Sequence, residues 1–200
     1  MKITQRIGKA AFTLIELMAV ITIIVILAGL VIGGMGFVTE RQAKEKARVQ
    51  IALLSKAIEE YKLDMGTYPP TADKSTASAP NGTGTSSILF NYLYWDSDND
   101  AAGVGSDDDQ KIYLSDLDPV TSKQGWTTKP VGSSTVIVDP WGNQYCYRTA
   151  TGVSNDTAGT AAPNTSTQNP DFDLWSMGKD GKTKPATPSD PTNRDDIKNF

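Results

Sequence analysis

The feature that most constrains the fold is an uncharged apolar run near the N-terminus. Residues 17–38 contain no charged side chain, and a helix of that length can cross the hydrocarbon core of a bilayer. One carboxylate, Glu16, stands directly before this run. A charged side chain within a membrane segment costs about 2.5–3.5 kcal/mol on insertion scales. We therefore expect Glu16 to have a function and a cationic partner.

A short basic leader precedes the apolar run, with its cations at Lys2, Arg6 and Lys9. Ala11 is small enough for a peptidase subsite. Cleavage between Ala11 and Phe12 would create a new ammonium group on Phe12, close to the Glu16 carboxylate of a neighbouring copy. An ion pair between subunits would then offset the cost of burying each charge.

Two other interpretations of the N-terminus stay open. Residues 17–32 could be the apolar core of an ordinary secretory signal that is cleaved near Gly36, or the run could be an uncleaved membrane anchor. The first residue of the mature protein separates the three, because only the first interpretation exposes Phe12.

The segment Phe12–Leu17 resembles the cleavage and methylation signature of type IV pilins and type II secretion pseudopilins. In that family a prepilin peptidase cuts before the Phe and methylates its amine, and the Glu governs subunit assembly. The resemblance therefore implies processing at Ala11 and Phe12 and an assembly role for Glu16. The family usually has Gly before the cut, where this chain has Ala11.

One long helix is predicted from Phe12 to about Met65, since this span contains no Pro. Its second half carries apolar residues at steps of four and three, which is typical of one helical stripe: Ala47, Ile51, Leu54, Ile58, Tyr61 and Met65. We expect this stripe to pack against a globular head, with a coiled coil as the alternative. Glycines at 29, 33, 34 and 36 either weaken the helix or allow close helix packing.

Beyond the helix, Gly66–Pro70 predicts a helix end, 71–87 a loop, and 88–95 a short buried helix or extended segment. Three strands are predicted at 134–138, 144–148 and 172–176, the first two forming a hairpin around the turn residues 139–143. The expected fold class is α+β and type IV pilin-like: a long N-terminal helix packed on a small antiparallel sheet with long loops. The expected parts are a leader (1–11), a transmembrane and assembly half (12–38), an amphipathic half (39–66) and a head (67–200).

Composition narrows the function. The chain has no His, one Cys and a net charge of −4. His-based catalysis and His-ligated zinc are therefore excluded, and no other nucleophile with a base is evident. Phosphate binding depends on clustered Lys and Arg, so we expect no nucleic acid partner for a single subunit. The lone Cys146 cannot form an intrachain disulfide, and its alternating aromatic surroundings predict a buried thiol.

Two acidic segments are candidate cation sites. Residues 96–100 alternate acids like the start of an EF-hand, but Ala101 and Asp107 stand where that motif needs Gly and Glu, which favours a solvated loop. Residues 139–143 and 172–181 resemble the head of the major type II secretion pseudopilin. That resemblance implies a calcium site made by Asp180, the carbonyl of Met177, and Asp195 with Asp196. The loop 182–194 is longer than the family's, and a merely solvated tail is the alternative.

The expected function is a non-catalytic, major pseudopilin-like subunit of a type II secretion pseudopilus, with calcium as a cofactor. Expected partners are further copies in a homopolymer, prepilin peptidase, other pseudopilins, the inner-membrane assembly platform, and membrane lipid before assembly. The resemblance places the chain in the bacterial inner membrane as a single-pass protein with a periplasmic head. The alternative is a surface type IV pilus subunit that serves adhesion, motility or DNA uptake; a membrane-tethered hydrolase lacks any plausible catalytic group.

Overall fold

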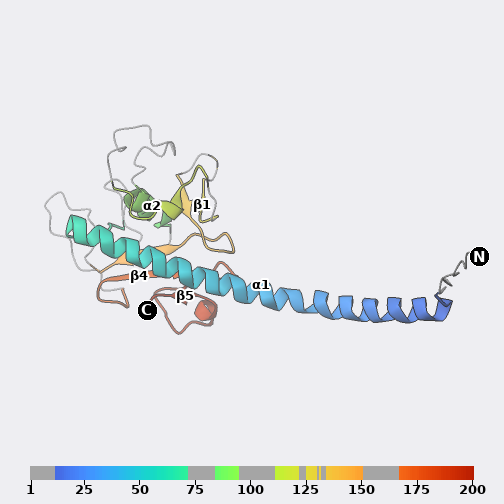
Figure 1. Ribbon diagram of the computed structural model, residues 1–200. Helices are drawn as coiled ribbons and strands as arrows, with labels where there is room; N and C mark the ends of the chain where they lie inside the picture. Colours follow the sequence, from blue (N-terminus) through green and yellow to red (C-terminus); the bar gives the residue numbers. More distant parts are fainter. Residues whose placement is uncertain are drawn as a thin grey trace, which may run out of the picture. The chain divides into compact units, whose positions relative to one another are not determined.

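The computed structural model describes residues 12–71, 84–94, 111–121, 125–129, 131, 134–150 and 167–200. The chain forms two compact units, one ending at Gln42 and the other running from Ala43 to Phe200. Figure 1 shows the elements coloured along the chain: α1 (Leu14–Met65), α2 (Ser86–Tyr94), η1 (Ser115–Leu117), β1 (Thr127–Thr128), β2 (Val136–Ile137), β3 (Cys146–Thr149), β4 (Phe172–Ser176), η2 (Pro191–Arg194) and β5 (Ile197–Lys198).

The predicted long helix is confirmed as α1, which runs without a break through residues 29–36. An 18-residue window within it has a mean hydropathy of 2.9 and no buried residue, so α1 is long and apolar enough to cross a membrane. It ends where the sequence predicts. Gly66 takes a positive φ of 77°, and its N–H donates to the Lys62 carbonyl at 2.8 Å, a common way for a glycine to close a helix.

The apolar stripe of α1 packs into the core of the second unit. Its residues from Ala47 to Tyr61 are buried, and Leu54 and Ile58 have no exposed surface. Met65 is the exception, with 44% of its surface exposed, because the helix ends at that residue. The same core contains the buried apolar face of α2, which consists of Leu89, Phe90 and Leu93. Of the two structures predicted for residues 88–95, a short helix or an extended segment, the chain therefore forms the helix.

Within the described residues, the strands form two antiparallel sheets, whereas the sequence predicts a single one. One sheet has the order β3-β4-β5, and the other pairs β1 with β2. The expected fold class, a long helix with a small antiparallel sheet, is confirmed, but the predicted membership of the sheet is wrong. Val136–Ile137 pair with Thr127–Thr128. The predicted hairpin keeps the bridge between Val138 and Gln144 and two hydrogen bonds, from the N–H groups of Asp139 and Tyr145 to the carbonyls of Asn143 and Ile137, at 2.8 Å and 3.1 Å.

Two hydroxyl groups at the start of α2 explain this difference. The Ser86 hydroxyl donates to the Ile137 carbonyl at 2.6 Å and accepts from the Ile137 N–H at 2.7 Å. Thr85 does the same for Tyr147, at 2.9 Å and 3.0 Å. These side chains satisfy main-chain groups that a neighbouring strand would otherwise bind. The hairpin therefore opens beyond the hydrogen bond between Tyr145 and Ile137.

Cys146 lies inside the three-stranded sheet as the sequence predicts. It is a free thiol with 1% of its surface exposed. Burial raises its pKa to about 12, and the charges of Asp196 and Asp139 add to that effect. The thiol is therefore protonated at neutral pH and has little nucleophilic character. The leader 1–11 and the acidic segment 96–100 lie outside the described residues.

Candidate assembly and cation-binding sites

The start of α1 holds Glu16 in a capping box with Thr13. The Thr13 main-chain N–H and hydroxyl both donate to Glu16 Oε2, at 2.9 Å and 2.7 Å. The Glu16 N–H in turn lies 3.4 Å from the Thr13 hydroxyl oxygen. This reciprocal pattern satisfies N–H groups that the first helical turn leaves unpaired. The sequence contains the signature of a capping box, Thr-x-x-Glu, at residues 13–16. The sequence analysis assigned Glu16 only an assembly role and did not identify this signature.

The capping box gives the Glu16 carboxylate a second role beside the predicted one. Thr13 orients the carboxylate at the first turn, while Phe12, the residue next to it, has 83% of its surface exposed. A carboxylate near a helix N-terminus is also stabilised by the helix dipole. Ala11, the other predicted processing residue, lies outside the described residues.

In the head, the turn at 139–143 is organised by Asp139. Its Oδ1 accepts from the N–H groups of Trp141 at 3.0 Å and Asn143 at 2.8 Å, and its Oδ2 accepts from the Ser176 hydroxyl at 2.6 Å. Only 2% of the residue is exposed. Burial raises the pKa of Asp139 against the opposing effect of these bonds. The turn is thereby fixed to the end of β4.

A second turn, at residues 177–181, packs on the first. Asn143 Nδ2 donates to the Gly178 carbonyl at 2.6 Å. Gly178 has a φ of 63°, and a Cβ there would lie 2.5 Å from the Asp195 carbonyl oxygen. The absence of a side chain at Gly178 therefore lets Asp195 approach the turn that begins at Met177.

The structure brings Asp180 and Asp195 together across the long loop. The Asp180 N–H donates to Asp195 Oδ2 at 3.0 Å. The Asp180 carboxylate itself turns back and accepts from the Lys182 N–H at 2.8 Å. The two residues are thus joined through main chain and carboxylate, and the Asp180 side chain closes its own turn.

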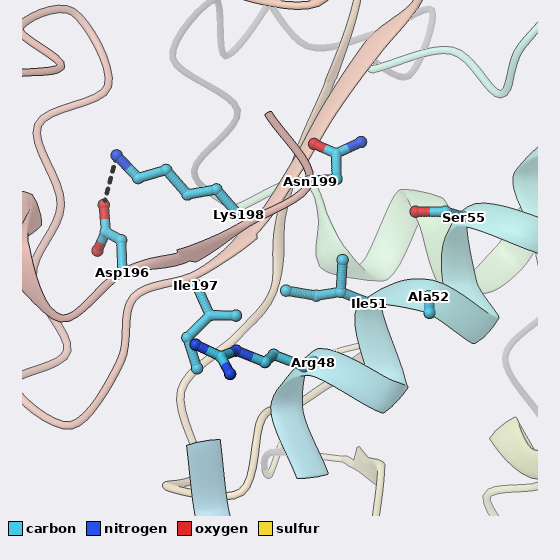
Figure 2. Close-up of a pocket in the computed structure, with 8 residues that line it drawn as sticks. All are labelled: Arg48, Ile51, Ala52, Ser55, Asp196, Ile197, Lys198 and Asn199. Carbon is cyan, nitrogen blue, oxygen red and sulfur yellow. Dashed lines mark ion pairs between the residues drawn. The ribbon is translucent and has the colours of Figure 1, made fainter. Parts of the chain in front are cut away.

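Asp196 lies deeper than its neighbours, with 1% of its side chain exposed. Its Oδ2 accepts from the Thr183 hydroxyl at 3.0 Å and lies 3.5 Å from the Lys198 ammonium. Figure 2 shows this ion pair beside a pocket of about 440 Å³ between α1 and β5. Asp196 Oδ1 is buried and has no hydrogen-bond partner. Burial raises the pKa of Asp196, and the Thr183 and Lys198 contacts oppose this.

Some oxygen atoms around Asp196 are of the kind that a hard cation binds, but they do not form a complete set of ligands. Calcium binds six to eight oxygens from carboxylates and carbonyls, and the unpartnered Asp196 Oδ1 is a buried acceptor of that kind. Asp195 and the carbonyl of Met177 are oxygen donors from the adjoining turns. Within the described part of the chain, however, no three acidic or thiol side chains gather closely enough to hold a metal ion.

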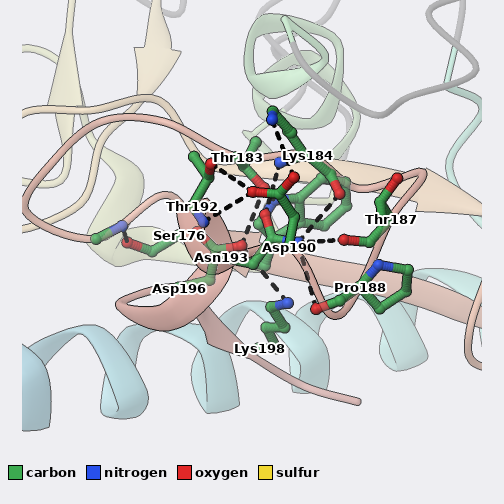
Figure 3. Close-up of polar contacts among 12 residues, drawn as sticks. Ser176, Thr183, Lys184, Thr187, Pro188, Asp190, Thr192, Asn193, Asp196 and Lys198 are labelled. Atoms are coloured by element: carbon green, nitrogen blue, oxygen red, sulfur yellow. Dashed lines mark hydrogen bonds and ion pairs between the residues drawn. The ribbon is translucent and has the colours of Figure 1, made fainter.

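The loop 182–194 is folded by its own polar contacts, drawn in Figure 3. Asn193 Oδ1 accepts from the Lys184 N–H at 2.6 Å, and its Nδ2 donates to the carbonyls of Lys184 and Thr187 at 3.1 Å and 2.8 Å. Asp190 caps η2 by accepting from the Thr192 N–H at 2.9 Å, and it pairs with the Lys184 ammonium at 2.9 Å. The sequence analysis did not identify these residues; the Asp-Pro-Thr sequence at 190–192, typical of a capped helix start, was the available signal.

Both halves of α1 match models of known protein families. Residues 6–32 match the family model described as the prokaryotic N-terminal methylation motif, and residues 37–93 match that of type II secretion system protein G. The matched regions together cover the processing signature, the apolar run except residues 33–36, the amphipathic stripe and α2 except its last residue.

Three relatives carry the same description, "type II secretion system core protein G". The Pseudomonas aeruginosa protein is 29% identical over 89% of this chain and 89% of its own length. The Aeromonas hydrophila protein is 40% identical over 34% of this chain and 47% of its own length. The Escherichia coli protein is 45% identical over 32% of this chain and 43% of its own length. The chain thus spans less than half of the latter two.

No solved structure matches the chain significantly. The family models, the Pseudomonas relative and the observed helix agree with the resemblance drawn from Phe12–Leu17. The chain therefore carries the N-terminal methylation motif and is similar to type II secretion system core protein G.

Proposed function

We propose that this chain is a structural subunit of a type II secretion pseudopilus, in the role of the major pseudopilin. The observation that carries this proposal is the succession of a methylation motif at 6–32 and a protein G match at 37–93 along one helix. The similarity to core protein G over 89% of the chain supports the same role. These matches favour secretion over the alternative of a surface pilus.

Processing and assembly follow from the residues at the start of α1. Prepilin peptidase removes the leader between Ala11 and Phe12 and methylates the new amine, as the methylation motif implies. The Phe12 ammonium of one subunit then pairs with the Glu16 carboxylate of its neighbour. In the structure Thr13 orients that carboxylate through two hydrogen bonds, so less freedom is lost when the pair forms.

The apolar part of α1 anchors the subunit in the inner membrane before assembly and packs among other copies after it. Residues 67–200 form a periplasmic head that has no catalytic role. Other pseudopilins and the inner-membrane assembly platform are the further partners. The exposed apolar side chains between Phe12 and Val38 support this use of the helix. An apolar surface of this size is rarely exposed to water and usually marks a contact with membrane or protein.

Two matched variants separate assembly from helix capping. Glu16→Gln keeps an acceptor for Thr13 and so preserves the capping box, but it removes the charge that pairs with Phe12. Thr13→Ala removes the box and keeps the charge. We expect Glu16→Gln to insert in the membrane and to form at least ten-fold fewer filaments, while Thr13→Ala assembles almost normally. Membrane fractionation and electron microscopy of sheared filaments provide the readouts. Normal filaments from Glu16→Gln would contradict the ion-pair mechanism.

We also propose that the head binds calcium through Asp180, Asp195, Asp196 and the carbonyl of Met177. The unpartnered, buried Asp196 Oδ1 supports this proposal, as does the close approach of Asp195 to the turn at Gly178. The ion would supply positive charge between adjoining turns of the head and so stabilise its C-terminal segment. Isothermal titration of the detergent-solubilised chain with calcium tests it, and absence of binding up to millimolar concentrations would refute it.

A further inference from the structure

The apolar run of α1 ends at a contact between an aromatic ring and a cation. Arg41 is the first basic residue after the uncharged residues 17–38, and its Cζ atom lies 5.0 Å from the centre of the Phe37 ring. Phe37 has 67% of its surface exposed. The two residues are four positions apart and so lie on the same face of the helix. A guanidinium over an aromatic face is attracted by the ring, so Phe37 holds the Arg41 charge on the surface of α1.

This contact shows the direction in which the Arg41 side chain points. Side chains of a helix lean toward its N-terminus and cover the preceding turn. The 5.0 Å between Arg41 Cζ and the centre of the Phe37 ring shows that Arg41 follows this rule. Its charge is therefore directed back toward the apolar run, in the direction in which a membrane would lie.

Helix geometry places this charge at the surface of a bilayer. Residues 17–38 extend over about 33 Å at 1.5 Å per residue, close to the roughly 30 Å of hydrocarbon in a bilayer. The Cα atom of Arg41 lies about 4.5 Å beyond that of Val38 along the axis. When the run fills the hydrocarbon, a guanidinium that leans back from residue 41 lies at the level of the phospholipid phosphates. The Phe37 ring then lies at the edge of the hydrocarbon, with its apolar surface away from water.

We propose that Arg41, held by Phe37, binds the phosphate group of a phospholipid in the membrane that α1 spans. This inference rests on the proposed function, in which α1 anchors the subunit in the inner membrane before assembly. A guanidinium can donate two parallel hydrogen bonds to one phosphate, and its contact with the ring reduces the freedom that binding would otherwise cost. Anionic phospholipids are favoured, because residues 39–48 have four basic and two acidic side chains.

The proposed contact fixes how deeply α1 lies in the membrane. Glu16 precedes Arg41 by 25 residues, or about 37 Å along the helix. A phosphate bound at Arg41 therefore holds Glu16 near the opposite surface of the bilayer, where a carboxylate is less costly than at the centre. The contact must break when the subunit leaves the membrane for the filament.

Three variants and a control separate the phosphate contact from the effect of net charge. Arg41→Gln removes the cation, Arg41→Lys keeps the charge but not the planar fork of donors, and Phe37→Leu keeps an apolar side chain but removes the ring. Lys46→Gln is the control. It removes one charge from the same segment, but residue 46 is turned by about 140° from residue 41 around the helix.

The experiment titrates phosphatidylglycerol into the full chain in detergent and measures the bound lipid by native mass spectrometry. We expect Arg41→Gln to bind the lipid about five-fold more weakly than the wild type, Arg41→Lys and Phe37→Leu to lie between the two, and Lys46→Gln to resemble the wild type. Equal affinities of Arg41→Gln and wild type, an equal loss in Lys46→Gln, or the absence of bound lipid from the wild type would overturn the inference. Inorganic phosphate should not displace the lipid; displacement would identify a site for free phosphate and would also overturn it.

A second measurement tests the contact in a bilayer. In vesicles of phosphatidylcholine and phosphatidylglycerol, solid-state NMR should detect an arginine Cζ signal whose intensity is reduced by dipolar coupling to lipid phosphorus. The reduction should be present in Lys46→Gln and absent from Arg41→Gln. A reduction that persists in Arg41→Gln would assign the coupling to another arginine and overturn the inference.

The same vesicles separate a failure of this inference from a failure of the proposed function. If no arginine Cζ couples to lipid phosphorus while the chain stays in the membrane, the phosphate contact fails and anchoring by α1 stands. If the chain is not recovered with the vesicles, the anchoring role fails as well.

Discussion

At the scale of single residues, the contacts that join the two head turns were only partly visible in the sequence. Gly142 and Gly178 both lie in segments with clear turn chemistry, and both take positive φ angles of 89° and 63°. Only the structure distinguishes them. A Cβ on Gly142 would meet nothing within 4 Å, whereas one on Gly178 would overlap Asp195, a residue that is remote in sequence.

We therefore expect Gly178→Ala to be clearly more destabilising than Gly142→Ala. A left-handed backbone costs a non-glycine residue about 1–2 kcal/mol, which applies to both positions. At Gly178 the collision with the Asp195 main chain adds about 1–3 kcal/mol. Urea unfolding of the two variants in detergent, followed by tryptophan fluorescence, measures the difference. Equal unfolding free energies would show that Asp195 does not pack on this turn.

The charge of Asp190 predicts how the loop 182–194 responds to acid. Hydrogen bonds from the Thr192 hydroxyl and N–H, and then from Lys184, lower the pKa of Asp190 to about 2, from 3.8. A lowered pKa in the folded state means that the ionised form stabilises the fold. This stabilisation is present above pH 3.8 and is lost as the pH falls through about 2. The Asn193 side-chain amide signals should broaden in that range in the wild type. Asp190→Asn should lack a transition there, and an identical pH profile would exclude Asp190 as its source.

At the scale of elements, prediction from the sequence was most successful where one pattern repeats. The stripe on α1 and the helix end at Gly66 could be predicted because each depends on local sequence. The pairing of the short strands could not be predicted in this way. β5 consists of two residues, too few to show alternation. The predicted pairing of β2 with 144–148 is cut short because Ser86, fifty-one residues away, bonds to both main-chain groups of Ile137. Pairings decided by a distant hydroxyl leave no periodic signal.

The stripe on α1 gives a matched test of packing within one helix. Leu54 has no exposed surface, whereas Leu63 is 82% exposed. We expect Leu54→Ala to lower the free energy of unfolding by about 2–5 kcal/mol, because it leaves a cavity in the core. Leu63→Ala should change it by less than about 0.5 kcal/mol. Thermal or urea unfolding measures both. A small loss at Leu54 would mean that the helix is not held by this core.

At the scale of the whole molecule, the resemblance at Phe12–Leu17 predicted a pilin-type processing signature, and the match of residues 6–32 to the methylation motif agrees with it. The predicted cation site remains a proposal. Its proposed ligands come from the turn at 177–181 and from Asp195 and Asp196, which follow a loop folded by Asp190 and Asn193. The Asp-Pro-Thr sequence at 190–192 signals the capped start of η2, but no local pattern indicates the contacts of Asn193.

In the proposed function assembly depends on processing, and Ala11 stands where the signature that this chain resembles usually has Gly. We expect the mature chain to begin with a methylated Phe12, and Ala11→Gly to increase the rate of cleavage at the same bond. Mass spectrometry of the N-terminal peptide after a pulse of synthesis measures both. Faster cleavage of the wild type than of Ala11→Gly, or a mature chain that begins elsewhere, would contradict this prediction.

The burial of Cys146 makes the protein convenient for chemical labelling. It is the single cysteine of the chain, and a thiol with 1% of its surface exposed and a pKa of about 12 reacts very slowly with maleimides at neutral pH. The native chain thus contributes almost no background. A cysteine introduced at an exposed position, such as Ser189→Cys, would carry a fluorophore on each subunit without removal of the natural thiol, and growth of single filaments could then be followed by light microscopy.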